Sequence, residues 1–199
     1  MKTTKSPFRI IAASLAAMFL SACLYAGVHL YVVPFETSKK ALVELSFPIL
    51  SEVAIYVYDN DDNLVRHENI EKGSVYKRIY DFSELERGYY TIISDSKDLK
   101  VTKIIQVNTQ SIEVVSTEYF YRPVFTMQGD ILHIEYKNPD QSDVKISIED
   151  SEDIYYMENL QGDELFKKSF NIQQLSRGEY TVRFEVNGYR FAYYIRKDL

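Results

Sequence analysis

The stretch "LERGYYTI" at residues 85–92 returns 90 residues later as "LSRGEYTV" at residues 175–182. Both copies follow the pattern Leu-x-Arg-Gly-x-Tyr-Thr and end in a β-branched residue. The segments on either side alternate apolar and polar residues, which is typical of half-buried β-strands. A motif that one chain contains twice in the same setting indicates either a shared scaffold or a shared binding site.

The spacing of the motif favours the scaffold. In immunoglobulin-like (Ig-like) sandwiches, a tyrosine near the start of a late strand hydrogen-bonds to the backbone a few residues upstream and closes a corner. The pattern predicts a leucine that fills the core, a glycine that adopts a positive φ in the turn, and the corner tyrosine. These residues are Leu85, Gly88 and Tyr90 in the first copy and Leu175, Gly178 and Tyr180 in the second.

The repeat extends well beyond this motif. Aligning Val53 with Val144 also matches the Glu-Asn pairs at 68–69 and 158–159, after one deletion in the second copy. The alignment predicts two modules of about 80 residues each, a length that suits small β domains. We place module boundaries at 36–118 and 119–199, after an N-terminal segment of residues 1–35.

Period-two alternation dominates both copies, as in "EVAIYVYD" (52–59) and "YTVRFEV" (180–186). Turn formers such as "DNDDN" (59–63) and "NPDQSD" (138–143) separate these runs, and almost no helical pattern occurs. The predicted fold class is therefore all-β: two tandem Ig-like antiparallel β-sandwich modules after an N-terminal export signal.

The first residues have the order of an export signal. Three basic residues precede the uncharged apolar run Ile10–Leu20, and small residues follow it. "LSAC" at 20–23 resembles the lipobox of bacterial lipoproteins, in which the cysteine is lipidated, and Cys23 is the only cysteine of the chain. Two alternatives stay open: cleavage after Ala26, or an uncleaved membrane anchor over Ile10–Val33. In each case we expect the remainder outside the cytoplasm, anchored in a membrane, periplasmic or secreted.

The exported part is acidic and has no disulfide. Removing Lys2, Lys5 and Arg9 lowers the 23 basic residues to 20, against 29 acidic ones, for a net charge of −9. No basic stripe occurs, so nucleic acid is a poor candidate partner. Membrane contact is expected only through the N-terminal lipid or anchor.

The combined pattern "V-x-I-x-[VI]-x-D … E-N-[IL] … L-x-R-G-x-Y-T-[IV]" resembles the C-terminal sorting domains of the type IX secretion system, and equally small exported Ig-like sandwich proteins. The resemblance covers residues 40–107 and 130–197. It implies the fold and export, and for the second module an interaction with secretion machinery through Leu175, Gly178, Tyr180 and "NGYRFAYYIRK" (187–197). A sorting domain follows a large cargo, and no such cargo precedes these modules.

Catalytic patterns are absent from the sequence. Beyond the export segment only His67 and His133 remain, and neither a Gly-x-Ser-x-Gly motif nor a glycine-rich phosphate loop occurs. We therefore expect no enzyme activity and no cofactor. The acidic turns give weak calcium candidates, although aspartate is also common in tight hairpins. These candidates are Asp59, Asp61, Asp62, Asp150 and Asp153.

Tyrosine doublets suggest a binding surface. Alternation along a strand sends one member of each doublet inward and the other outward, and Tyr89, Tyr156 and Tyr194 are the predicted outward members. The sequence thus predicts an exported non-enzymatic binding, adhesion or scaffold protein of the bacterial envelope, whose partner is an envelope or extracellular protein or glycan. The alternatives are a type IX secretion-associated protein and a carbohydrate-binding accessory protein.

Overall fold

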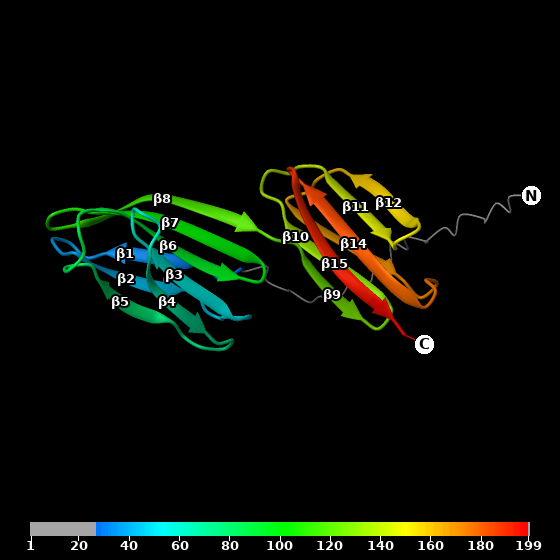
Figure 1. Ribbon diagram of the computed structural model, residues 1–199, viewed down its shortest axis with the longest axis horizontal. Helices are drawn as coiled ribbons and strands as arrows, with labels where there is room; N and C mark the ends of the chain where they lie inside the picture. Colours follow the sequence, from blue (N-terminus) through cyan, green and yellow to red (C-terminus); the bar gives the residue numbers. More distant parts are fainter. Residues whose placement is uncertain (1–26, 199) are drawn as a thin grey trace, which may run out of the picture. The chain divides into compact units, whose positions relative to one another are not determined.

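The structure is a computed structural model and describes residues 27–198. Within this range it contains fifteen β-strands and no helix. The chain divides into two compact units between Arg122 and Pro123. We call residues 27–122 module 1 and residues 123–198 module 2; Figure 1 shows the strands of each.

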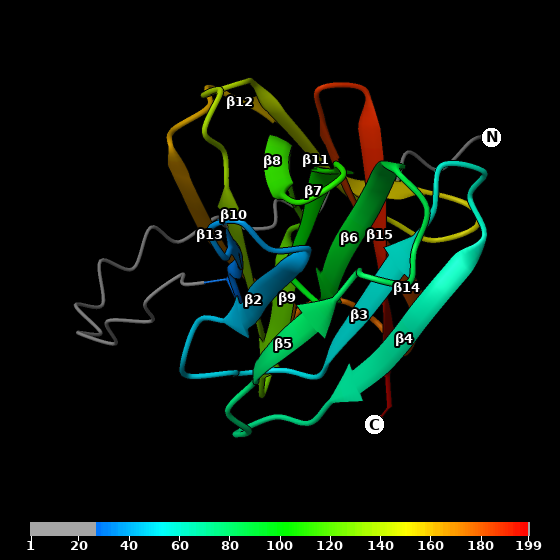
Figure 2. The ribbon, with the colours of Figure 1, turned by 90° about the vertical axis from the view of Figure 1, so that its left-hand side faces the viewer.

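Module 1 is a sandwich of two antiparallel sheets. The three-stranded sheet has the order β1 (Leu30–Pro34), β2 (Lys40–Leu45) and β5 (Lys77–Asp81). The five-stranded sheet has the order β4 (Leu64–Ile70), β3 (Val53–Tyr58), β6 (Gly88–Ser96), β7 (Leu99–Val107) and β8 (Ile112–Tyr121). Figure 2 shows β4 along the outer side of β3.

Module 2 is a sandwich of three and four strands. Its smaller sheet has the order β13 (Leu165–Asn171), β10 (Ile131–Lys137) and β9 (Val124–Gln128). Its larger sheet has the order β12 (Ile154–Leu160), β11 (Val144–Glu149), β14 (Gly178–Val186) and β15 (Tyr189–Lys197).

The two modules have the same strand order, as the internal repeat predicts. Strands β9 to β15 take the places of β1 to β7, and both sheets are antiparallel, as in Ig-like sandwiches. The last hairpins match in register: Gly88 pairs with Val107 in module 1, and Gly178 pairs with Lys197 in module 2. Only β8 has no counterpart in module 2. The predicted fold class is confirmed.

Alternation along the strands builds each core. In β3, Val53, Ile55 and Val57 are buried, and in β11 the equivalent Val144, Ile146 and Ile148 are buried. Successive side chains of a strand point to opposite faces, so these three project between the sheets. Burying one such side chain contributes about 1.5–3 kcal/mol, so these strands stabilise both modules.

The predicted boundary at residue 35 is wrong. Strand β1 begins at Leu30 and pairs with β2, and Val28, Leu30 and Val32 lie in the core of module 1. The apolar residues of this strand follow the apolar run of the predicted export signal, so hydropathy alone does not separate the two. Residues 28–33 are thus part of the sandwich, so a membrane-spanning helix that extends to Val33 does not fit this fold.

The predicted boundary at residues 118 and 119 is also wrong, because it divides β8. Strand β8 pairs with β7 from Val107 opposite Ile112 to Leu99 opposite Tyr121, with one bulge. It therefore belongs entirely to module 1. The repeat alignment left this segment unassigned because module 2 contains no second copy of it.

Among residues 27–198, no helix is long and apolar enough to cross a membrane. The lipidation candidate Cys23 and the basic and apolar parts of the predicted export signal lie outside the described residues.

Candidate functional site

The corner motif is present in both modules. The Tyr90 hydroxyl donates to the backbone oxygen of Glu86 at 3.0 Å, and the Tyr180 hydroxyl donates to that of Ser176 at 2.8 Å. Burial raises the pKa of both tyrosines, so their hydroxyls stay protonated donors. Leu175 is buried and Leu85 packs against the core, as the motif predicts.

The expected role of the glycines in this motif is only partly right. Gly88 has a φ of 156°, a conformation that L side chains rarely adopt, whereas Gly178 has no positive φ. A Cβ at residue 178 would meet the Tyr180 ring at 3.7 Å, an ordinary van der Waals contact. The prediction of a positive φ at Gly178 is therefore wrong, because the chain enters β14 without a left-handed turn.

Each acidic turn folds around its first aspartate. Asp59 Oδ1 accepts hydrogen bonds from the backbone N–H groups of Asp61 and Asn63, both at 2.9 Å. Hydrogen bonds from Asn63 lower the pKa of Asp59. Asp62 has a φ of 60°, a conformation that aspartate adopts readily in tight turns. The carboxylate of Asp59 thus stabilises its own turn.

Asp150 does the same in module 2. Its Oδ1 accepts the backbone N–H groups of Glu152 and Asp153 at 2.8 Å, and its Oδ2 accepts the Tyr155 hydroxyl at 2.6 Å. Across residues 27–198, no three His, Cys, Asp or Glu side chains form a group that could hold a metal ion. The calcium candidates of the two turns therefore do not converge around a cation.

The three predicted surface tyrosines differ in exposure. Tyr89 on β6 and Tyr194 on β15 are exposed, with 47% and 78% of their surface accessible. Tyr156 on β12 instead faces inward: it lies opposite the buried Ile148, and its ring packs edge-on against Phe170 at 5.0 Å. The expectation that Tyr156 points outward is wrong, because a bulge beside Tyr155 interrupts the alternation of β12 and both tyrosines of the doublet are half-buried.

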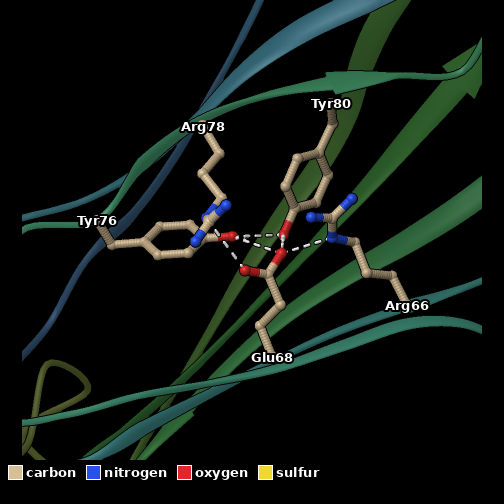
Figure 3. A network of polar contacts seen from close by, with 5 residues as sticks. All are labelled: Arg66, Glu68, Tyr76, Arg78 and Tyr80. Carbon is tan, nitrogen blue, oxygen red and sulfur yellow. Dashed lines mark hydrogen bonds and ion pairs between the residues drawn. The ribbon is translucent and has the colours of Figure 1, made fainter.

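The densest polar cluster of module 1 surrounds Glu68 (Figure 3). Glu68 Oε1 accepts hydrogen bonds from Tyr76 and Tyr80, both at 3.1 Å, and from Arg66 Nε at 2.5 Å. Its Oε2 lies 3.2 Å from Arg78 Nε. The two tyrosine hydroxyls are 2.6 Å apart. We call these five residues the Glu68 cluster.

The Glu68 cluster joins the two sheets of module 1. Arg66 and Glu68 belong to β4 of the larger sheet, while Arg78 and Tyr80 belong to β5 of the smaller one, and Tyr76 immediately precedes β5. Burial alone would raise the pKa of Glu68, but hydrogen bonds from Arg66 and Tyr76 lower it below its ordinary value. The carboxylate is ionised and surrounded by donors, which suits a structural clamp and not a general base.

Module 2 has a simpler version of this clamp. Glu158 Oε2 lies 2.6 Å from Lys168 Nζ and also accepts a hydrogen bond from Tyr156. By the internal repeat, Phe166 and Phe170 take the places of Tyr76 and Tyr80. Glu158 therefore lacks the two buried hydroxyl partners that Glu68 has.

The feature that most clearly distinguishes module 2 is its last strand. β15 pairs with β14 along nine residues, and no other strand among residues 27–198 pairs with it. An unpaired edge presents backbone N–H and C=O groups that can bind another strand. Arg190, Tyr194 and Arg196 project from the outer face of β15, with Arg190 and Arg196 side chains 80% and 72% exposed.

In module 1 the equivalent edge is covered. Figure 1 shows β8 alongside β7, and their pairing spans nearly the full length of β7. Ile112 of β8 is buried and Val114 packs against the core. The Lys103 ammonium group on β7 also donates to Thr117 Oγ1 on β8 at 2.9 Å.

Arg122 fastens the end of β8 to the β6–β7 hairpin. One of its guanidinium nitrogens lies 2.7 Å from Asp95 Oδ1 and 2.6 Å from the backbone oxygen of Ser96, and its backbone N–H donates to Asp98. Sequence reasoning missed both β8 and this contact. The alternation of Ile112 and Val114 was the available signal.

No family model and no curated protein matches this sequence. Among solved structures, the chain is similar to the FN1–FN3 domains of chicken CNTN1, with 8% identity and a TM-score of 0.27 over 81% of this chain and 62% of that one. It is also similar to the central fibronectin-III array of RIM-binding protein, with 8% identity and a TM-score of 0.24. This match covers 85% of this chain and 96% of that one. The chain spans about three fifths of the CNTN1 fragment. The fold assignment rests on strand order and register.

Proposed function

We propose that this chain is an exported, non-enzymatic binding protein of the bacterial envelope in which module 2 contacts a protein partner through β15. The observation that carries this proposal is the difference between two equivalent edges: β7 is paired on both sides, whereas β15 is paired on one. Natural sheets commonly cover or shorten their edges, so a nine-residue open edge is a candidate interaction surface. The export signal, with Cys23 as a lipidation site, would present this edge outside the cytoplasm.

Site-specific photo-crosslinking in intact cells tests the proposal. A photoreactive phenylalanine analogue would replace Tyr194 on β15 in one strain and Tyr89 on β6 in another. Both tyrosines are exposed strand residues, so each serves as the control for the other. We expect a discrete protein adduct from position 194 and none from 89. Adducts from 89 alone, or from neither, would contradict the proposal. A secretion component in the adduct would identify the type IX alternative.

Anchoring has its own test, the intact mass of the mature protein from fractionated cells. Acylation at Cys23 gives a chain starting at that residue with added lipid mass. A chain starting at Gly27 retains all of β1 and is a soluble exported form. A mass that includes Met1 would contradict processing at either site.

One observation favours glycan binding as a second candidate. A hollow of about 260 Å³ lies between the turn at 59–61 and the corner at 84–90, and exposed Tyr89 lies on it beside carboxylates. Aromatic faces next to carboxylates are suited to sugar rings and their hydroxyls. We expect a glycan array to show binding that Tyr89→Ala abolishes and Tyr194→Ala preserves. Binding that is insensitive to Tyr89 would exclude this hollow.

A further inference from the structure

In module 1, strand β8 pairs with β7, the equivalent of β15, and its sequence indicates what kind of strand would pair with β15. This inference rests on the proposed function. The strand pairing gives the correspondence: Gln106 of β7 occupies the position of Arg196 of β15, and Lys100 occupies that of Arg190. On β7, Gln106 lies opposite Glu113 of β8, and Thr102 lies opposite Glu118. The internal strand therefore places two carboxylates along this edge.

If a strand with the sequence of β8 paired with β15, its carboxylates would lie near the arginines of β15. Glu113 would lie directly opposite Arg196, and Glu118 would lie opposite Ala192, diagonally across from Arg190. Directly opposite and diagonal residues of an antiparallel pair are both within reach of long side chains. Arg190 and Arg196 contact acidic neighbours only at 3.6 and 3.3 Å and are largely exposed, so their guanidinium groups are accessible to a further carboxylate.

The same charges disfavour pairing of β15 with a second copy of itself. Full antiparallel overlap of Tyr189–Lys197 with its own copy places Arg190 of one chain opposite Arg196 of the other. Like charges directly opposite each other destabilise a strand pair. Module 2 thus combines an edge that is open for pairing with charges that oppose self-association, although the chain as a whole is acidic.

The inward side of the edge is aromatic. Tyr193 stacks on Phe125 of β9 at 5.2 Å with an interplanar angle of 6°, and this ring pair closes the space between the two sheets. On β7 the equivalent inward position, Lys103, contacts Thr117 of β8. A strand added to β15 would bring its inward side chains against the Tyr193 ring, so apolar residues are favoured there.

We propose that β15 binds an extended segment of another protein in antiparallel orientation, with apolar side chains facing inward and carboxylates facing Arg190 and Arg196. The partner is thus an acidic, alternating peptide strand. Recognition combines backbone hydrogen bonds along the edge with two charge pairs that set the register.

The probe is a synthetic peptide with the sequence of residues 110–122, which contains β8, added to the mature full chain. We expect slower amide hydrogen exchange in β15 and about tenfold weaker binding when Glu113 and Glu118 of the peptide are replaced by lysine. The charge-reversed protein R190E/R196E should show the opposite preference and bind the lysine peptide better. Lys167→Glu, on the other sheet of module 2, is the matched control and should not alter binding.

Each result has a defined meaning. Exchange in β15 that is unchanged by the peptide at millimolar concentration would overturn the proposal. Protection that is independent of peptide charge would overturn the acidic partner class. A concentration-dependent dimer of the native chain with slowed amide exchange in β15 would show self-pairing instead. If these tests fail while position 194 still gives protein adducts in cells, the proposed function holds and only the partner chemistry is wrong.

Discussion

The two modules share a fold but differ at both sides of the larger sheet. At the β4 side of module 1, Glu68 has four donors, whereas Glu158 at the β12 side of module 2 has two. At the opposite side, β8 covers β7, while β15 is open. Module 1 therefore has a larger polar cluster on one side of this sheet and an added strand on the other. The difference indicates that the core determines the sandwich and that the edges adapt each copy to its role.

Removing the cover of module 1 should have the largest effect. Ile112→Asp introduces a charge at a buried position of β8, and we expect module 1 to lose about 3 kcal/mol of unfolding free energy. The loss should appear in the urea dependence of amide exchange in residues 27–122 and not in residues 123–198. Val115→Asp changes an exposed position of the same strand, and we expect it to cost under about 0.5 kcal/mol. Equal losses from both variants would show that β8 is not a structural cover.

Neutralising the clamps should have the next largest effect, and an unequal one. Glu68→Gln removes the charge that two arginines and two tyrosines share, for an expected loss of about 2 kcal/mol in module 1. Glu158→Gln disturbs one half-exposed ion pair, for an expected loss under about 1 kcal/mol in module 2. Urea unfolding read separately for each module measures both losses. Losses of the same size would mean that the larger set of donors around Glu68 adds nothing to the stability of module 1.

The features that the two modules share could be predicted from the sequence, because each depends on residues within one short segment. Strands such as β3 and β11 have period-two alternation, and the corner tyrosines carry their own motif. Matching Glu68 with Glu158 already indicated a shared position.

The rest depends on contacts between distant segments. Glu68 meets Tyr80 only because β4 and β5, which belong to different sheets, form the same side of the sandwich. Tyrosines at 76 and 80 have spacing that predicts a common strand face, but no local pattern shows what faces them. Likewise, β15 resembles β7 in sequence pattern, and its outer edge is open because no second strand among residues 27–198 pairs with it. Edge exposure is therefore a property of the fold and not of the strand.

Acid should weaken module 1 through Glu68. Hydrogen bonds and nearby arginines hold its folded pKa below the unfolded one, so its contribution to stability is present above the unfolded pKa. That contribution declines as the pH falls through the lowered folded value. We expect the difference in urea midpoint between the native chain and Glu68→Gln to be constant near neutral pH and to shrink towards pH 3. A difference that grows in acid would contradict the direction of the shift.

The corner tyrosines should show the smallest effect on the comparison, because the two modules are alike there. Tyr90→Phe and Tyr180→Phe each remove one hydroxyl-to-backbone hydrogen bond, and we expect each to cost about 1 kcal/mol in its own module. Urea unfolding followed by amide exchange in each module measures the two losses. A loss of stability in one module only would show that the tyrosine corner stabilises one copy and not the other. Equal costs would place the functional divergence of the modules at their edges, because their corners and cores respond in the same way.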